Sequence, residues 1–252
     1  MSHSIEIENL DKTFGSGLIV FKDFQLTIHE NEILSILGPS GCGKSTLLHL
    51  ISGLQKASSG RVEISPALQS FGFVFQDPHL LPWRNLEQNV SIALEFQQIS
   101  EAERRSRVAE ALEMLGLNEF SKAYPAELSG GMKMRASLAR ALVTRPKVLL
   151  LDEPFAALDE PLRQKLDLEL RRLWKSLGLT IIVVTHSITE AIFLSNRMIV
   201  LSDRPSRILR DEKIELPLER TSQMRWSPEV MNLANEVTKL IGDFDIKEGH
   251  TA

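Results

Sequence analysis

The sequence predicts an α/β fold in which helices cover both faces of a largely parallel sheet. Three short, continuous apolar runs separated by helical segments are typical of strands buried on both faces. These runs are residues 148–152, 180–184 and 198–201. A fourth run, residues 32–37, leads through a glycine-rich loop into a helical stretch at residues 45–52. This order of strand, loop and helix places the loop at the carboxyl edge of the sheet.

The N-terminal residues predict a small antiparallel sheet that precedes this core. Phe24, Leu26 and Ile28 alternate with polar residues, which is the pattern of a strand with one buried face. Further strands are expected at residues 5–10, 60–64 and 71–75.

A helical insert is expected at about residues 85–144. Ser100 and Glu103 have the spacing of a capping box, and Gly116 stands where that helix would end. A further helix is expected at residues 160–177, with a regular stripe of leucines that we interpret as core packing. The stripe consists of Leu162, Leu166, Leu170, Leu173 and Leu177.

The C-terminal residues predict an appended helix. The sequence there becomes polar, and Ser227 with Pro228 has the pattern of an N-cap and first helical residue for a segment to about Ile241. We therefore divide the chain into one domain at residues 1–220, which contains the helical insert, and a helical tail at residues 221–252.

Composition narrows the class of protein. The chain has 252 residues, of which 43% are hydrophobic and 25% charged, as is ordinary for a globular protein. Its formal net charge of -4 gives no general attraction for nucleic acid, so no nucleic-acid partner is expected. The single cysteine, Cys42, excludes an internal disulfide and a multi-cysteine zinc site, which favours a reducing, cytoplasmic compartment.

The sequence predicts neither export nor a membrane span. Residues 1–7 are polar and include Glu6, unlike a secretory signal. The most apolar runs, residues 148–151 and 181–184, are far shorter than the ~20 residues that cross a bilayer. If the protein serves a membrane process, we expect other chains to cross the membrane.

The glycine-rich loop has the sequence of a phosphate-binding loop. It reads Gly38-Pro39-Ser40-Gly41-Cys42-Gly43-Lys44-Ser45, between a strand and a helix as such a loop requires. Glycines let backbone N–H groups turn inward around a phosphate, and the helix adds the positive end of its dipole. Lys44 is expected to reach the β- and γ-phosphates, and Ser45 to ligate Mg²⁺. The alternative is a glycine turn with a chance lysine.

Cys42 lies inside this loop. Nearby amide donors and Lys44 favour the thiolate form of a cysteine. We therefore predict that alkylation of Cys42 blocks nucleotide binding.

Two adjacent acids follow the apolar strand that starts at residue 148. Asp152 would lie at the carboxyl edge of the sheet beside the phosphate loop, which suits it to Mg²⁺. Glu153 is a candidate general base that could polarise a water for attack on the γ-phosphorus. The alternative is that two acids merely solvate the end of a strand.

A second glycine-rich segment, Leu128-Ser129-Gly130-Gly131-Met132, precedes a helix expected at about residues 132–144. Ser129 and the glycine amides would form a second anion site at the N-terminus of that helix. A second copy of the chain, presenting its Ser129 loop to the nucleotide of the first, would explain both sites. Taken alone, the segment is also compatible with an ordinary helix cap.

Together these segments resemble the ATPase domain of ATP-binding-cassette (ABC) transporters, over roughly residues 5–208. Residues 128–132 are similar to the signature motif that separates this family from kinases, GTPases and recombinases, with Met132 in place of the commoner glutamine. The resemblance implies a P-loop NTPase with a RecA-like parallel core, an N-terminal antiparallel β subdomain and a helical signature-motif subdomain. It also implies hydrolysis of ATP with Mg²⁺, and a dimer of ATPase subunits. Nucleotide contacts are implied for Gly38, Pro39, Ser40, Gly41, Cys42, Gly43, Lys44, Ser45, Thr46, Ser129, Gly130 and Gly131.

The resemblance assigns four residues outside these segments. It implies that Gln76 senses the γ-phosphate and Mg²⁺, that His186 contacts the γ-phosphate, and that Asp159 bridges two subunits. Phe14 occupies the position where the family usually stacks an aromatic ring on adenine. Gln76 and His186 both follow strands, where an amide can ligate Mg²⁺ and an imidazole can donate to phosphate. Asp159 could also cap the helix at residues 160–177, and Phe14 could pack in the core.

Residues 77–84, after Gln76, are a candidate contact with a partner. Prolines restrict this segment, and Leu80, Leu81 and Trp83 supply apolar surface that suits a partner helix. The alternative is that these side chains cover the core of the protein itself. This segment and residues 132–135 resemble importers of the nitrate, sulfonate and taurine group.

That resemblance implies uptake of a small anionic solute through two integral membrane permease subunits. An extracytoplasmic substrate-binding protein would deliver the solute, and the ATPase would lie at the cytoplasmic face of the membrane. An ATPase subunit does not touch the cargo, so its sequence does not identify it. The alternatives are lipid transport or export, a soluble ABC ATPase, and a small-molecule kinase, which would leave Ser129 to Gly131 without a role.

Overall fold

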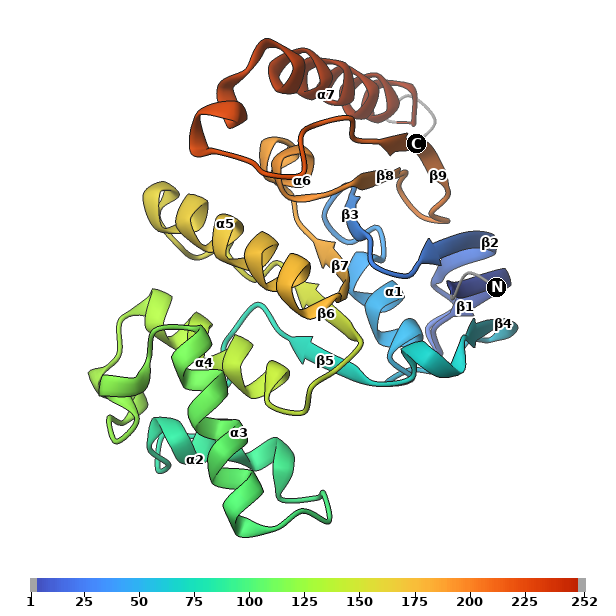
Figure 1. The fold of residues 1–252 in the computed structure, drawn as a ribbon. Helices are drawn as coiled ribbons and strands as arrows, with labels where there is room; N and C mark the ends of the chain where they lie inside the picture. The colour runs from blue at the N-terminus through green and yellow to red at the C-terminus, as the bar shows by residue number, and fades with distance from the viewer. Residues whose placement is uncertain (1–3, 249–252) are drawn as a thin grey trace.

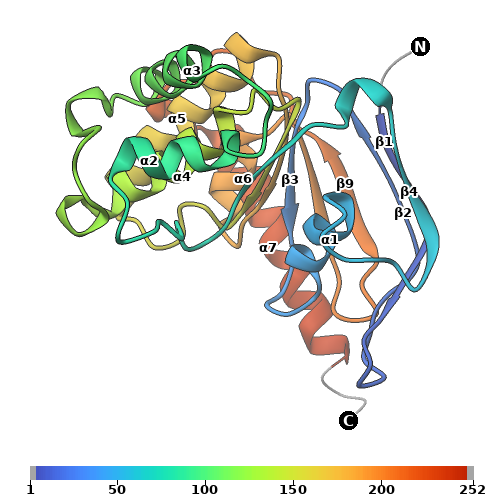
Figure 2. The ribbon, with the colours of Figure 1, turned by 90° about the horizontal axis from the view of Figure 1, so that it is seen from below.

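The structure, a computed structural model, describes residues 4–248, with side chains to Gly242. Its strands form two sheets, and helix α1 (Lys44–Ile51) lies between them (Figure 1, Figure 2). The larger sheet is mainly parallel and carries helices on both faces. The α/β fold class predicted from the sequence is therefore confirmed.

The smaller sheet is antiparallel, with the strand order β2-β1-β4. Its strands are β1 (Ser4–Thr13), β2 (Ile19–His29) and β4 (Ser59–Ile64). Ile5 in the central strand pairs with Ile28 on one side and Ile64 on the other. Phe24, Leu26 and Ile28 are buried while the residues between them are exposed, as their alternation predicts.

The larger sheet has the strand order β5-β6-β7-β3-β8-β9. Its parallel strands are β5 (Phe71–Val74), β6 (Val148–Asp152), β7 (Thr180–Val184), β3 (Ile33–Leu37) and β8 (Arg197–Leu201). The edge strand β9 (Ile208–Lys213) runs antiparallel to β8 and was not predicted. Its residues are largely polar because an edge strand is paired on one side only.

Alternate side chains of the parallel strands enter two different cores. Leu34 and Ile36 of β3 pack with α1 and the antiparallel sheet. Ile33 of the same strand packs on the other face, with the helical insert and helix α5 (Glu160–Leu177). The continuous apolar runs in the sequence reflect this double burial.

The helical insert forms a lobe beside β5, the lower lobe in Figure 1. Its helices are α2 (Leu86–Ser91), α3 (Glu101–Met114) and α4 (Gly130–Leu142), and α4 packs on α2, α3 and β5. Ser100 Oγ accepts a hydrogen bond from Glu103 N at 3.1 Å, which is one half of the predicted capping box. Gly116 follows α3 with a φ of 62°, a left-handed conformation that ends helices.

Helix α5 has the predicted bounds, but its leucine stripe is buried only in part. Leu166, Leu170 and Leu173 are buried, whereas Leu177 is 39% exposed. The prediction for Leu177 was wrong because residues 175–178, the last turn of the helix and its cap, are all exposed.

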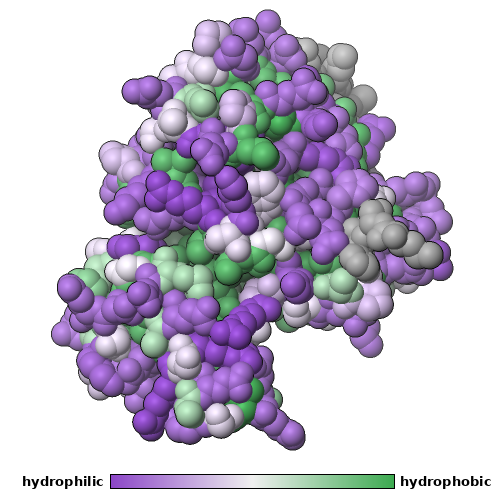
Figure 3. All heavy atoms as spheres, viewed as in Figure 1, coloured by the Kyte–Doolittle hydropathy of each residue, from purple (hydrophilic) through white to green (hydrophobic). Residues whose placement is uncertain are grey.

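The C-terminal part covers β8 with two helices, α6 (Ile188–Leu194) and α7 (Pro228–Glu248). Helix α7 starts at Pro228 as predicted and runs past residue 241, where we expected it to end; residues 249–252 of the predicted tail lie outside the described residues. Val230, Ala234 and Val237 pack against α6 and β8. No helix within residues 4–248 is long and apolar enough to cross a membrane. Polar residues cover most of the face drawn in Figure 3.

Candidate functional site

The glycine-rich loop, residues 38–45, joins the carboxyl end of β3 to α1. Gly41 and Gly43 have φ angles of 80° and 122°, in the region that favours glycine. A Cβ on Gly43 would lie 2.4 Å from Val20 Cγ1, because the loop passes directly over β2. At position 43 both the backbone angle and the lack of space require glycine.

Lys44 and the first turn of α1 form the positive part of this loop. The Lys44 side chain is 6% exposed, and its Nζ donates to the carbonyl oxygens of Gly38 and Pro39, each at 2.8 Å. The ammonium group therefore lies within the loop. Helix α1 has no side-chain cap at its N-terminus, so its first amides are available to an anion.

Asp152 at the end of β6 contacts Ser45, as the predicted Mg²⁺ site requires. Ser45 Oγ donates to Asp152 Oδ1 at 3.0 Å. Burial and then the neighbouring charge of Glu153 raise the pKa of Asp152, while the Ser45 hydrogen bond lowers it. Within residues 4–248, no group of three or more His, Cys, Asp or Glu side chains could hold a metal ion. One carboxylate and one hydroxyl fit Mg²⁺, which commonly takes its remaining ligands from phosphates and water.

Glu153 and His186 meet at the same edge of the sheet. Their strands are neighbours, with Asp152 of β6 in register with Val184 of β7, and Glu153 Oε2 lies 3.0 Å from His186 Nδ1. Glu153 has a φ of 46°, a left-handed conformation that is costly for a side chain other than glycine or asparagine. Its backbone N–H donates to Val184 O at 3.0 Å, which helps to hold it there.

Gln76 follows β5, the strand beside β6, and its side chain is exposed. The next residues are held by Arg140 of α4, which the sequence analysis did not single out. Its guanidinium donates to the carbonyl oxygens of Pro78 and His79 at 2.6 and 2.7 Å, and burial lowers its pKa. No pattern in the sequence around Arg140 predicts this contact, because it forms only once α4 packs beside β5.

The Ser129 loop lies on a different part of the molecule from the phosphate loop. Ser129 Oγ accepts from Met132 N at 3.3 Å as the cap of α4, and a Cβ on Gly131 would lie 2.4 Å from Leu162 Cδ2 of α5. Asp159 caps α5 by accepting from Leu162 N at 3.0 Å. The Ser129 loop and Asp159 therefore share one surface. Within the described residues no hydrogen bond or ion pair joins this surface to the phosphate loop.

The structure corrects our expectation for the Cys42 thiol. The side chain is fully buried in the core between α1 and the two sheets, although its backbone belongs to the loop. This burial raises the pKa of Cys42, and the charge of Lys44 opposes the rise only in part. The thiolate form is therefore disfavoured, contrary to the prediction.

Phe14 and residues 80–83 lie between the core and the surface of the protein. The Phe14 ring packs partly on the same core, and Lys12 Nζ lies 4.9 Å from its centroid. Leu80 packs against the core of the helical insert, whereas Trp83 is 71% exposed. One of these apolar side chains thus covers the protein itself, and another is free to meet a partner.

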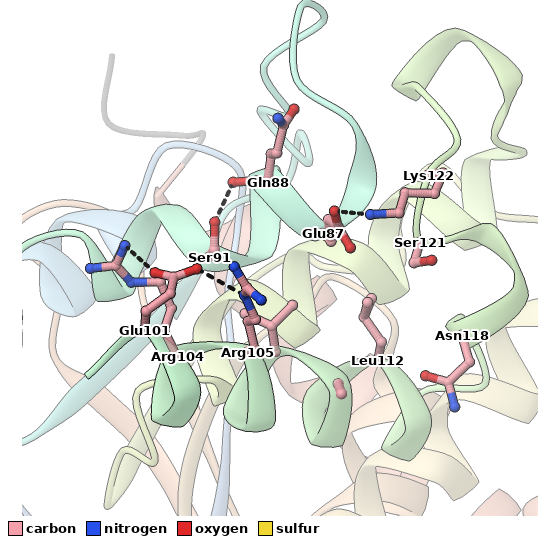
Figure 4. Close-up of a pocket in the computed structure, with 12 residues that line it drawn as sticks. Glu87, Gln88, Ser91, Glu101, Arg104, Arg105, Leu112, Asn118, Ser121 and Lys122 are labelled. Carbon is pink, nitrogen blue, oxygen red and sulfur yellow. Dashed lines mark hydrogen bonds and ion pairs between the residues drawn. The ribbon is translucent and has the colours of Figure 1, made fainter. Parts of the chain in front are cut away.

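A cavity of about 630 Å³ lies between α2 and α3 (Figure 4), and its lining includes none of the predicted site residues. Its charged side chains pair among themselves: Glu87 with Lys122, and Glu101 with Arg104 and Arg105 at 3.3 and 3.0 Å. The predicted site residues instead line an open loop and the edge of the sheet. The predicted site is therefore an open surface and not an enclosed cavity.

Comparisons with known proteins agree with this geometry. The sequence profile described as ABC transporter matches residues 21–156. The aliphatic sulfonates import ATP-binding protein of Bacillus licheniformis is 40% identical over an alignment 248 residues long, and the alignment covers 95% of this chain and 94% of that protein. The nitrate import ATP-binding protein of a Synechocystis strain is 38% identical over an alignment 259 residues long, and the alignment covers 97% of this chain and 97% of that protein.

A solved structure is similar over most of the chain. It is the dimeric structure of a post-hydrolysis state of an ATP-binding cassette bound to ADP and Pi. The TM-score is 0.74 and the sequence identity 34%, with 84% of this chain and 100% of the other covered.

Proposed function

Because the chain belongs to the ABC transporter family, we propose that it is the ATP-hydrolysing subunit of an importer and works as a dimer beneath two membrane permease subunits. The observation that carries the proposal is a pair of contacts at the sheet edge, Ser45 with Asp152 and Glu153 with His186. They set two oxygen donors and an acid–imidazole pair beside the phosphate loop. Phosphoryl transfer to water in P-loop proteins uses Mg²⁺ held by a hydroxyl and a carboxylate, and a residue that positions the attacking water.

ATP would bind first at the phosphate loop. The open amides of α1 and the buried ammonium of Lys44 would meet the phosphates with little rearrangement, since Lys44 Nζ already lies within the loop. Phe14 would stack on the adenine, and Lys12 beside its ring would remain close to the nucleotide.

Ser45 and Asp152 would hold Mg²⁺ together with phosphate oxygens, and Gln76 would join them from the end of β5. Bound there, Mg²⁺ supplies positive charge that neutralises the phosphates. The raised pKa of Asp152 supports this role, because a carboxylate made costly by burial gains most from a nearby cation.

Glu153 would orient the attacking water and accept its proton. The hydrogen bond to His186 fixes one carboxylate oxygen, which leaves the other for water. His186 has an exposed ring, so its second nitrogen can face the γ-phosphate. The left-handed backbone of Glu153 keeps this carboxylate at the edge of the sheet.

A second copy of the chain would complete each site. Ser129 and Gly130 lie on one surface with Asp159, separate from the phosphate loop of their own chain, whereas Gly131 is buried against Leu162. In a twofold dimer this surface would face the nucleotide of the partner. The similarity to a dimeric cassette supports this arrangement.

The permease subunits would meet the segment after Gln76. Trp83 offers exposed apolar surface there, and Arg140 links the segment to α4, the helix that follows the Ser129 loop. Closure of the dimer could thus be transmitted to the membrane subunits. We propose that the chain lies with them at the cytoplasmic face of the membrane. The nearly full-length similarity to sulfonate and nitrate import proteins supports a small anionic cargo, delivered by an extracytoplasmic binding protein.

The test uses Glu153→Gln in the native cells, with extraction in mild detergent and ATP. We expect binding of ATP to persist while turnover falls by about 100-fold or more, because a general base is lost. The trapped complex should contain a multi-spanning permease in stoichiometric amount, identified by mass spectrometry. Near-normal turnover would remove Glu153 from its role, and recovery of only ribosomes, DNA or soluble enzymes would overturn the transport function.

A further inference from the structure

Residues on both sides of His186 are tied to helix α6. Thr185 Oγ1 donates to Glu190 Oε2 at 2.5 Å and accepts from Ser187 N at 3.1 Å. Ser187 Oγ in turn accepts from Glu190 N at 3.3 Å, as the cap of α6. The position of His186 therefore depends on where this short helix lies.

Two buried arginines hold the other end of α6. Arg220 comes from the segment that follows β9, and Arg171 from α5. Cations at the carbonyl end of a helix are favourable, so these guanidinium groups stabilise α6 through its carbonyl oxygens. Arg220 donates to the carbonyl oxygens of Ile192, Phe193 and Ser195, and Arg171 donates to that of Leu194 at 2.6 Å.

Arg225, from the same C-terminal segment, is a third buried arginine that contacts α6. Its side chain is 1% exposed, pairs with the fully buried Asp167 of α5, and lies with its guanidinium 4.3 Å from the centroid of the Phe193 ring. Burial and then the charge of Glu190 raise the pKa of Asp167 to about 7, and the charge of Arg225 opposes this rise. The positive charge of Arg225 thus stabilises the negative charge of Asp167. It also acts on the carboxylate of Glu190, the residue that binds Thr185.

We infer that residues 217–226 act as a clamp that positions His186, and that Arg220 and Arg225 are positioning residues for ATP hydrolysis. Neither touches the reacting atoms; each acts on α6, which carries the His186 loop. The inference rests on the role of His186 in the proposed function. The inference predicts that residues 217–226 affect the rate of ATP hydrolysis more than the binding of ATP. A small displacement of a reacting group slows the chemical step more than it weakens binding.

The test uses the full chain carrying both Arg225→Met and Asp167→Leu. This double variant removes both members of the buried ion pair, so neither charge is left unpaired. Replacing both partners by apolar side chains often preserves the fold. We expect kcat for ATP hydrolysis to fall about 10-fold while KM changes less than about 2-fold. Hydrogen exchange should quicken in residues 186–195 and remain unchanged in residues 44–51.

Arg210→Met is the matched control. It breaks the pairs of Arg210 with Glu212 and with Glu236 of α7, neither of which lies on α6. We expect it to leave kcat and the exchange of residues 186–195 unchanged. Equal effects of Arg210→Met and the double variant would show a general loss of stability and overturn the inference.

A cycle with His186→Ala separates the inference from the proposed function. If the clamp acts through His186, the double variant should lower kcat in the wild-type background and have no further effect with His186→Ala. An additive loss, or unchanged exchange in residues 186–195, overturns the clamp. If His186→Ala leaves kcat unchanged, the proposed role of His186 is wrong, and the inference fails with it even where exchange has quickened.

Discussion

Helices α1 and α4 both follow glycine-rich segments, yet their N-termini are built in opposite ways. Helix α1 begins after Gly43 with no side-chain cap, and the Lys44 ammonium lies within the loop. Helix α4 begins after Ser129, whose hydroxyl caps the helix, and Gly131 is pressed against α5. The N-terminus of α1 therefore offers free amides and a cation to an anion. At the N-terminus of α4, one amide already donates to the side chain that caps the helix.

This difference separates a terminus that can bind alone from one that can only assist. We therefore expect the free amides together with Lys44 to form a phosphate site at α1 within a single chain. Ser129 accepts from Met132 through its oxygen, so its own hydroxyl hydrogen remains free to donate to a phosphate held elsewhere. We expect α1 to set the affinity for ATP and α4 to set turnover in the dimer.

Disabling each terminus in turn should give the largest effects. Lys44→Ala should weaken ATP binding by about 100-fold, since a buried, charge-assisted contact to phosphate is lost. Ser129→Arg should leave ATP affinity within about 2-fold but lower turnover by about 100-fold, because it blocks donation to the partner's nucleotide. Titration with a fluorescent ATP analogue and a phosphate-release assay measure the two effects.

Mixing the two variants controls for misfolding. A dimer of one Lys44→Ala chain and one Ser129→Arg chain has one site with both defects and one intact site. Random pairing in an equimolar mixture should therefore restore about a quarter of the wild-type activity, if the two sites act independently. No recovery on mixing would place the Ser129 loop and the phosphate loop in the same chain's site.

Gly131 distinguishes packing from ligand binding as the reason for glycine at the start of α4. Gly131→Ala should lower the free energy of unfolding by about 1–3 kcal/mol, because the new Cβ meets Leu162 Cδ2. Leu162→Ala should relieve that clash in the double variant. Gly130→Ala is the matched control, since its Cβ would lie 3.8 Å from Leu158 Cδ2 in ordinary contact. Urea denaturation measures the stability of the wild type, the two single glycine variants and the double variant. Equal losses of stability in Gly131→Ala and Gly130→Ala would refute the packing explanation.

Ser129→Ala isolates the cap of α4 and should have a smaller effect on stability. Loss of the hydrogen bond to Met132 N should cost about 1 kcal/mol of unfolding free energy. Ser100→Ala, which removes the comparable cap of α3, is the control. Both variants should lose similar stability, but only Ser129→Ala should slow hydrolysis. A similar turnover loss in both would mean that Ser129 acts as a cap alone.

Much of the sheet and its edge could be predicted because the responsible patterns are local. A buried strand needs a continuous apolar run, and a phosphate loop needs its glycines and lysine at fixed spacing, so both can be recognised without the fold. Parallel strands also bring their carboxyl ends to one edge. That rule accounts for the contact between Ser45 and Asp152, two residues far apart in the chain.

The remaining features depend on contacts that no local pattern encodes. Strand β9 is polar because it lies at an edge, and Arg140 reaches the 77–84 segment only after α4 packs beside β5. Arg220 and Arg225 are buried because their guanidinium groups bind a carbonyl oxygen of α6 and the carboxylate of Asp167. A charged residue gives no sign in the sequence that it will be buried with a partner.

Cys42 provides the finest test of how the α1 terminus is built, because its backbone lies in the open loop while its thiol is buried. Iodoacetamide at pH 8 should alkylate it at least about 10-fold more slowly than free cysteine, since burial limits access and its raised pKa limits the thiolate fraction. Urea should abolish that protection. Rapid alkylation of the folded chain would mean that the loop opens down to its side chains; slow alkylation would confine the anion-binding surface of α1 to its amides and Lys44.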